Sequence, residues 1–128
     1  QRILAAGDPY SGEVNRTATL VAARLGLGRF EFAYQSAGRT DEAWLGPDLR
    51  DVIRRLATEG LQELVVCPAG FVAEHLEVLY DIDIEAHAVA ESVGVRMERA
   101  PAMNDDPTFI GGLVDLVMRM LPPTARVA

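Results

Sequence analysis

The sequence is poor in residues that hold small proteins together by covalent or metal chemistry. Cys67 is the only cysteine, which excludes an intrachain disulfide and a site with several thiolate ligands. The chain also has no apolar run that approaches the ~20 residues of a membrane span, and no signal peptide is visible. We therefore expect a cytoplasmic protein without a membrane span.

Positive charge is scarce as well. The chain carries 12 basic and 19 acidic residues, a formal net charge of -7, and it has no lysine-rich segment. Nucleic-acid binding requires clustered Lys and Arg side chains that neutralise phosphates, so we expect no nucleic-acid partner. An acidic surface attracts cations instead.

What is present is the composition of an ordinary globular domain, with 49% hydrophobic and 24% charged residues. A chain of 128 residues can bury roughly two-thirds of its unfolded surface in one core. We expect a single α/β domain over residues 1–128, with a frayed tail at 122–128.

Apolar periodicity and turn residues predict alternating helices and strands. Helices are expected over Glu13–Leu25 (capped by Ser11), from Asp48 to about Glu59, from Gly70 to about Glu91 and after Asn104–Pro107, and strands over Phe30–Tyr34, Leu64–Pro68 and Val95–Arg99. This alternation indicates a parallel sheet with helices on both faces. The opening strand that such a fold normally has is missing. The apolar second strand is expected to be buried on both faces, with Cys67 in the core.

The segment GFVAEHLEVLYDIDIEAH (70–87) contains five carboxylates and both histidines of the chain. It leaves the carboxyl end of the second expected strand, the edge at which open α/β sheets bind their ligands. On a helix, Glu77, Asp81 and Glu85 form a row at i, i+4 and i+8, with Glu74 projecting into it. The opposite face, expected to pack on the sheet, holds Leu79, Ile82, Ala86, Val89, Ala90 and Val93.

The acidic row has two explanations. Most charge runs are solvated helix faces, and this one fits that description. Like charges four residues apart nevertheless destabilise a helix, and no Lys or Arg between Gly70 and Arg96 relieves them. A bound cation would relieve them, and carboxylates combined with imidazole suit borderline metals such as Fe²⁺ better than Ca²⁺.

The two histidines are interpreted differently. On an ideal helix, His75 and Glu77 differ by about 200°. They face one cleft only if His75 precedes the helix or if a wider, π-type turn distorts it; otherwise His75 is a capping or packing residue. His87 is interpreted as structural, and it can pair with Asp83 four residues earlier.

The polar loop from Gln35 to Gly46 carries the remaining candidates. Gln35 and Ser36 follow the first expected strand at its carboxyl end, where they either donate hydrogen bonds to a ligand or cap the turn. Trp44 is either a loop anchor packed on the core or a stacking surface for a flat aromatic ligand.

Four segments together resemble the C-terminal half of a ferrochelatase, an enzyme that inserts Fe²⁺ into a porphyrin in haem biosynthesis. They are GDPY (7–10), YQSAGRTDEAWLGPDL (34–49), CPAGFVAEHLEVLYDIDIE (67–85) and MNDDPTFI (103–110). The second segment is similar to the short bacterial enzymes of the coproporphyrin-using branch, which lack an iron-sulfur extension. The resemblance implies one half of a two-domain chelatase fold.

The resemblance also implies a role for each candidate residue. His75 and Glu77 match a catalytic pair that faces the porphyrin nitrogens and handles protons and metal. Glu77, Asp81 and Glu85 match a line of acids along a distorted helix, a path for metal or protons. Trp44 matches a pocket tryptophan, and Gln35 and Ser36 are expected beside it in the porphyrin pocket. Fe²⁺ is expected as substrate, with no iron-sulfur cluster, and the acidic row is a candidate Mg²⁺ site.

One departure from the family concerns the start of the chain. Ferrochelatases carry a second pocket histidine in a Ser/Thr-Ala-His-x-Leu-Pro motif, on a strand directly before the position of Gln1. We therefore interpret the chain as a fragment whose partner is the missing N-terminal half, acting on coproporphyrin III or protoporphyrin IX. The alternatives are a non-catalytic tetrapyrrole- or metal-binding module, and a half-size chelatase of another tetrapyrrole that acts as a homodimer.

Overall fold

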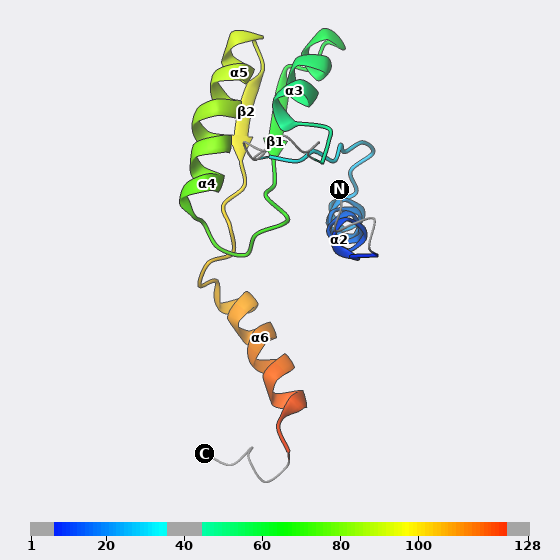
Figure 1. Ribbon diagram of the computed structural model, residues 1–128, viewed down its shortest axis with the longest axis vertical. Helices are drawn as coiled ribbons and strands as arrows, with labels where there is room; N and C mark the ends of the chain where they lie inside the picture. The colour runs from blue at the N-terminus through cyan, green and yellow to red at the C-terminus, as the bar shows by residue number, and fades with distance from the viewer. Residues whose placement is uncertain (1–6, 36–44, 123–128) are drawn as a thin grey trace.

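The computed structural model of the protein describes residues 7–35 and 45–122. A short parallel sheet is flanked by helices (Figure 1), which confirms the predicted α/β class. The elements in chain order are α2 (Tyr10–Leu25), α3 (Leu49–Thr58), β1 (Glu63–Val66), α4 (Leu76–Val78), the π-helix η1 (Leu79–Ala86), α5 (His87–Ser92), β2 (Arg96–Arg99) and α6 (Pro107–Met120).

The two strands pair in parallel, with Leu64 opposite Met97 and Val66 opposite Arg99. The continuous helical column α4–η1–α5 is the crossover that joins them, as parallel strands require. Side chains of β1 alternate between half-buried and exposed, and Val65 is 71% exposed. The prediction that this strand is buried on both faces is therefore wrong within the described residues. Leu64 and Val66 pack against the core on one face of the sheet. Cys67, predicted in the core, is exposed just beyond the strand.

The core lies between α3, the helical column and one face of the sheet. Ile53, Val78 and Ile82 are its largest fully enclosed side chains. The cluster is completed by Ala86, Ala90, Val95 and Met97. Both helical elements thus cover the same face of the sheet. On the other face, the described residues leave a hollow of about 290 Å³ lined by Glu63, Leu64, Val65, Arg96 and Glu98.

The prediction of which helix residues face the sheet was correct in part. Ile82, Ala86 and Ala90 are buried as predicted, and Leu79 and Val89 are partly buried. Val93, also predicted to face the sheet, is 37% exposed, whereas Val78 is fully buried. The difference has a physical cause, because the prediction assumed an α-helical turn over a stretch that forms a π-helix.

Helix α2 begins three residues earlier than predicted. Its N-cap is Pro9, and the first helical N–H, that of Tyr10, donates to Asp8 Oδ1 at 2.8 Å. Ser11, predicted as the cap, lies inside the first turn, where its Oγ is 3.1 Å from the hydroxyl of Tyr34. The helix ends at Leu25 as predicted, with Gly26 at φ 65°.

The strand predicted over Phe30–Tyr34 is wrong. It is reduced to an isolated bridge between Tyr34 and Asp48, made by hydrogen bonds of 2.8 Å from Tyr34 N to Pro47 O and 2.9 Å from Leu49 N to Tyr34 O. A strand needs a partner along its length, and within the described residues no strand runs beside residues 30–33.

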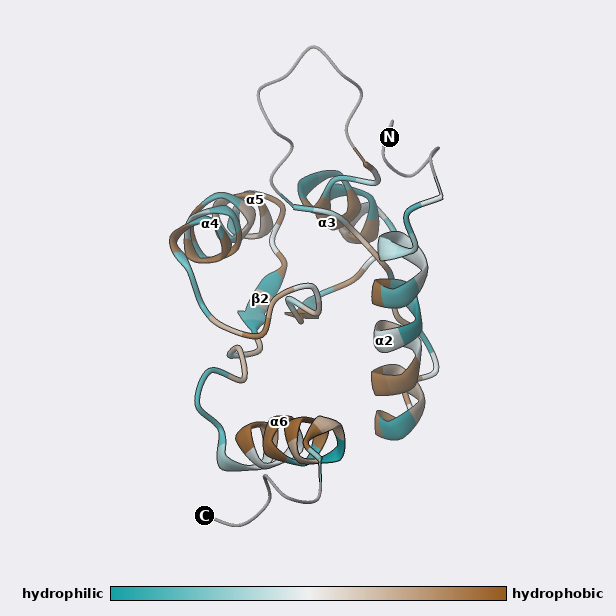
Figure 2. Cartoon of the chain, turned by 60° about the horizontal axis from the view of Figure 1, so that its bottom comes forward, coloured by the Kyte–Doolittle hydropathy of each residue, from teal (hydrophilic) through white to brown (hydrophobic). Residues whose placement is uncertain are grey.

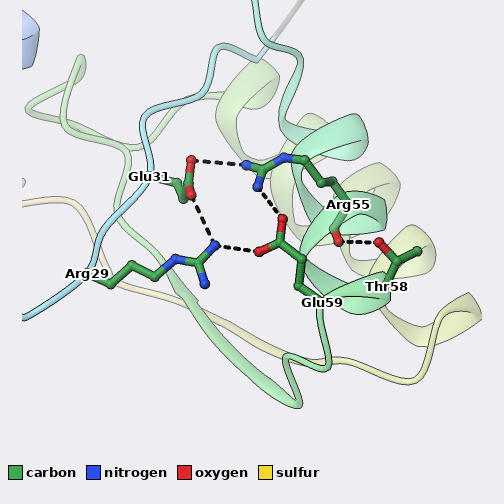
Figure 3. Close-up of polar contacts among 5 residues, drawn as sticks. All are labelled: Arg29, Glu31, Arg55, Thr58 and Glu59. Atoms are coloured by element: carbon green, nitrogen blue, oxygen red, sulfur yellow. Dashed lines mark hydrogen bonds and ion pairs between the residues drawn. The ribbon is translucent and has the colours of Figure 1, made fainter.

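The same segment is attached to α3 by side chains instead. Figure 3 shows Arg29 and Arg55 sharing the carboxylates of Glu31 and Glu59, with contacts of 2.6–3.3 Å. Each contact is solvent-exposed and worth little alone. The four charges together replace backbone pairing as the link between residues 29–31 and α3.

The predicted caps of the two remaining helices are confirmed. Asp48 caps α3 by accepting from Arg50 N at 2.8 Å, and Asp106 caps α6 directly before Pro107. Helices α2 and α6 stand away from the sheet, and apolar residues run along α6 (Figure 2). No described helix is both long and apolar enough to cross a membrane.

Candidate functional site

The candidate site lies where the chain leaves β1 and enters the helical column. His75 is the N-cap of α4 and has an extended backbone, with φ -150° and ψ 166°. Its carbonyl accepts from Leu79 N at 3.1 Å. The column turns into a π-helix at Leu79. The extended histidine before the helix meets one of the two conditions under which His75 and Glu77 can face one cleft, whereas the π-helix begins two residues after Glu77.

The acidic row formed by Glu77, Asp81 and Glu85 runs from α4 into the π-helix, with Glu77 in α4 and Asp81 and Glu85 in η1. Each acid directly precedes a fully buried residue, namely Val78, Ile82 or Ala86. The acidic row therefore follows the border of the core, with Glu77 exposed and Asp81 and Glu85 half-buried.

A cation reaches one end of this row from another element. Arg50 of α3 places Nη1 3.1 Å from Glu85 Oε2, while its Nε and Nη2 hold both carboxylate oxygens of Asp48 at 3.0 and 2.9 Å. The expectation that no basic residue relieves the row is thus wrong at Glu85. Hydrogen bonding to the Arg50 side chain lowers the pKa of Asp48, and the same contact raises the pKa of the arginine.

The two other carboxylates of the segment belong to a separate cluster. Arg99, whose side chain is only 14% exposed, contacts Asp83 Oδ1 through Nε at 2.6 Å and Glu74 Oε1 through Nη1 at 2.9 Å. These hydrogen bonds, with Asp83 first, raise the pKa of Arg99. Glu74 therefore does not project into the acidic row as expected.

His87 does not pair with Asp83 as predicted, because Arg99 occupies that carboxylate on both oxygens. Its Nδ1 lies 3.6 Å from Glu91 Oε1, one turn later on the same helix. The side chain is half-exposed, and its contact with Glu91 is local to α5.

Two predicted site residues carry buried polar atoms without a hydrogen-bond partner among the described residues. They are Nε2 of His75 and Nε2 of Gln35. The imidazole of His75 also packs edge-on against Phe71, with ring centroids 4.4 Å apart and planes at 72°. A buried polar atom left unpaired costs about 1–3 kcal/mol, so these two atoms are the ones most in need of a ligand.

The acidic row is not a ready-made metal cage. Within residues 7–35 and 45–122, no group of three or more His, Cys, Asp or Glu side chains is arranged to hold a metal ion. Mg²⁺ keeps several waters and needs only one or two carboxylates, but Glu85 is already paired with Arg50. A resident Mg²⁺ stays a prediction.

Ser36 and Trp44, the other predicted pocket residues, lie outside the described residues. Sequence reasoning also missed two residues at the site, Arg50 and Arg99. Both act on carboxylates of the segment through contacts 16 to 35 residues away in sequence. No local sequence pattern predicts such contacts.

Comparison with known proteins identifies the family of the chain. A ferrochelatase family model matches residues 1–121. The chain is 51% identical over 116 residues to a protein named ferrochelatase from Thermus thermophilus, covering 91% of this chain and 37% of the relative. It is 46% identical over 120 residues to the one from Deinococcus radiodurans, with 92% and 38% coverage. A protein named coproporphyrin III ferrochelatase from Geobacillus thermodenitrificans is 45% identical over 122 residues, with 94% and 39% coverage.

The similarity extends over nearly all of the chain, although the chain spans less than two-fifths of the length of these relatives. The matched region includes His75, the acidic row and the π-helix that carries Asp81 and Glu85. The chain belongs to the ferrochelatase family.

Proposed function

We propose that this chain forms one wall of the active site of a metal chelatase that inserts Fe²⁺ into a porphyrin. Metallation removes two pyrrole protons while a dication sheds its water, which calls for a base beside a line of anionic groups. The observation that carries the proposal is the junction of extended His75 and the helical column, because His75, with its unpaired Nε2, directly precedes the helix on which the acidic row begins at Glu77.

In this proposal His75 Nε2 accepts a pyrrole proton at the macrocycle, and Glu77, two residues further on, takes part in proton or metal transfer there. Asp81 and Glu85 continue the path along the helix. Arg50 marks its far end, since a cation at Glu85 must compete with the guanidinium 3.1 Å away. Gln35, with its unpaired Nε2 donor, is assigned to the porphyrin pocket together with Ser36 and Trp44.

We further propose coproporphyrin III as the substrate, because several relatives are named coproporphyrin III ferrochelatase. The activity is proposed for a protein of the relatives' full length, in which a further part completes the site, and its place is the cytosol. Fe²⁺ is the substrate of the reaction and no iron-sulfur cluster takes part.

The test is the loss of porphyrin fluorescence on addition of Fe²⁺ or Zn²⁺ to the full-length protein. His75→Ala and Glu77→Ala should each reduce the metallation rate by at least ~100-fold, in line with the loss of a general base. His87→Ala is the matched control, and its rate should equal that of the unaltered protein. Unchanged turnover in His75→Ala would contradict the assignment of His75 as the proton acceptor.

Two other outcomes have specific meanings. Porphyrin binding with no metallation, by either metal, would identify a non-catalytic binding module. Metallation by this chain alone, running as a dimer on a sizing column, would identify a half-size chelatase. Comparing coproporphyrin III with protoporphyrin IX in the same assay tests the proposed substrate.

A further inference from the structure

The segment that carries His75 is held mainly by one residue from elsewhere in the chain. Residues 72–75 lie between β1 and α4 and form neither helix nor strand. Asn104, beyond β2, donates its backbone N–H to Val72 O at 2.9 Å, and its Oδ1 accepts from Glu74 N at 2.9 Å. The two bonds bracket the segment on either side of Ala73 and end directly before His75.

The conformation of Asn104 suits this double contact. Its φ of 48° makes it the one non-glycine residue with positive φ within residues 7–35 and 45–122. Asn and Asp tolerate this left-handed region better than other residues with a side chain. In this conformation the backbone N–H and the side-chain Oδ1 of Asn104 both reach the segment from Val72 to Glu74. The two bonds resemble those that one peptide unit makes in a sheet.

A second contact holds the same place from the side. Arg99 binds the carboxylate of Glu74 through Nη1 at 2.9 Å and grips both oxygens of Asp83 in η1. Glu74 is therefore fixed at its backbone by Asn104 and at its side chain by Arg99. His75 follows it immediately, with its ring against Phe71.

We propose that Asn104 is a positioning residue for His75. By fixing the backbone from Val72 to Glu74, it sets where the His75 imidazole lies relative to the start of the π-helix and to Glu77. Its importance for catalysis rests on the function proposed above, whereas the positioning itself can be measured on this chain without any substrate.

The test uses Asn104→Gly, which keeps the left-handed backbone and its N–H but removes the side-chain acceptor. The Glu74 amide should exchange with solvent about tenfold faster, as expected for the loss of one hydrogen bond. The ring-proton resonances of His75 should move as its contact with Phe71 changes. Those of His87, the other histidine, should stay in place and serve as the internal reference.

Two further variants serve as controls for Asn104→Gly. Asn104→Asp keeps an acceptor oxygen and tolerates the same φ, so it should restore the exchange rate of Glu74 and the His75 resonances. Asp105→Gly, at the exposed neighbouring position, should change neither. If Asn104→Gly leaves both signals as they are, or if Asn104→Asp behaves like the glycine variant, the positioning role is wrong.

Arg99→Gln provides an independent test should Asn104→Gly fail to fold. It frees the Glu74 carboxylate and should move the His75 resonances in the same direction, whereas Arg96→Gln, on the same strand but paired with Glu63 on the open face of the sheet, should not. Unmoved His75 resonances in Arg99→Gln would contradict the proposal.

The positioning role and the proposed function can fail separately. In the full-length protein, Asn104→Gly should lower kcat for metallation about tenfold with the porphyrin KM unchanged. If His75→Ala metallates normally while Asn104→Gly still moves the His75 resonances, the positioning stands and the chelatase assignment falls.

Discussion

Two rows of side chains on the column α4–η1–α5 have the same spacing and opposite characters. Val78, Ile82 and Ala86 are enclosed in the core, each with at most 1% of its surface exposed, whereas Glu77, Asp81 and Glu85 lie one residue earlier in the chain, at the border of solvent. The buried row holds the helix against α3 and the sheet. The acidic row contributes charge that packing alone would not require, so stability and proposed function are separated by a single residue position.

The largest effect is expected when a side chain of the buried row is truncated. Ile82→Ala should lower the free energy of unfolding by about 2–5 kcal/mol, because it removes a fully enclosed side chain and leaves a cavity. Ile84→Ala is the matched control, since that side chain is 58% exposed on the same π-helix; its cost should stay within about 0.5 kcal/mol. Denaturant titration measures both, and equal costs would mean that the buried row is not what holds the helix.

The next test concerns Asp48, which caps α3 and holds the arginine that reaches the acidic row. Asp48→Ala should cost about 1–2 kcal/mol through the lost cap. Asp48→Asn keeps the capping oxygen and should cost less, because it removes only the charge paired with Arg50.

The pH dependence of this pair has a definite sign. Since Arg50 lowers the pKa of Asp48 below its ordinary value, the charge pair stabilises the fold above the unfolded pKa and is lost as pH falls through the folded one. The stability difference between the unaltered chain and Asp48→Asn should therefore shrink in the acid range below about pH 4. A difference that stays constant down to pH 2 would contradict this account.

Breaking the contact between the acidic row and α3 should have a smaller effect. Arg50 and Glu85 are each 39% exposed at the side chain, so Glu85→Gln should change the free energy of unfolding by at most about 1 kcal/mol. The change should diminish in high salt, which screens exposed pairs. A cost as large as that of Ile82→Ala would show that the acidic row is itself structural.

The smallest effect is expected at the end of the column. His87→Ala removes a half-exposed ring whose Nδ1 lies 3.6 Å from Glu91 Oε1. The free energy of unfolding should change by less than about 0.5 kcal/mol. A larger loss in thermal unfolding would mean that His87 belongs with the buried row.

The sequence predicted those parts of the site that depend on local geometry. The angular conflict between His75 and Glu77 required either that His75 precede the helix or that a π-type turn distort it; in the structure the histidine precedes the helix, and a π-helix follows from Leu79. The helix caps at Asp48 and Gly26 follow from side-chain chemistry and backbone freedom, which are also local.

Features that depend on tertiary neighbours could not be predicted in the same way. Residues 30–34 have the alternation of a strand, but a strand also needs a partner. The charges of Glu74, Asp83 and Glu85 looked unrelieved because their arginines come from α3 and β2. Asn104 was recognised only as part of a helix start, although its side chain faces the segment before His75.

The exposure of Cys67 gives the chain a practical property. As the only thiol, it accepts a spin label or fluorophore at one defined place, just beyond the strand from which the His75 segment departs. A paramagnetic ion such as Mn²⁺ broadens or quenches a nearby label according to its distance. A single attached probe would thus test the proposed metal path along the helix, with no second cysteine to replace first.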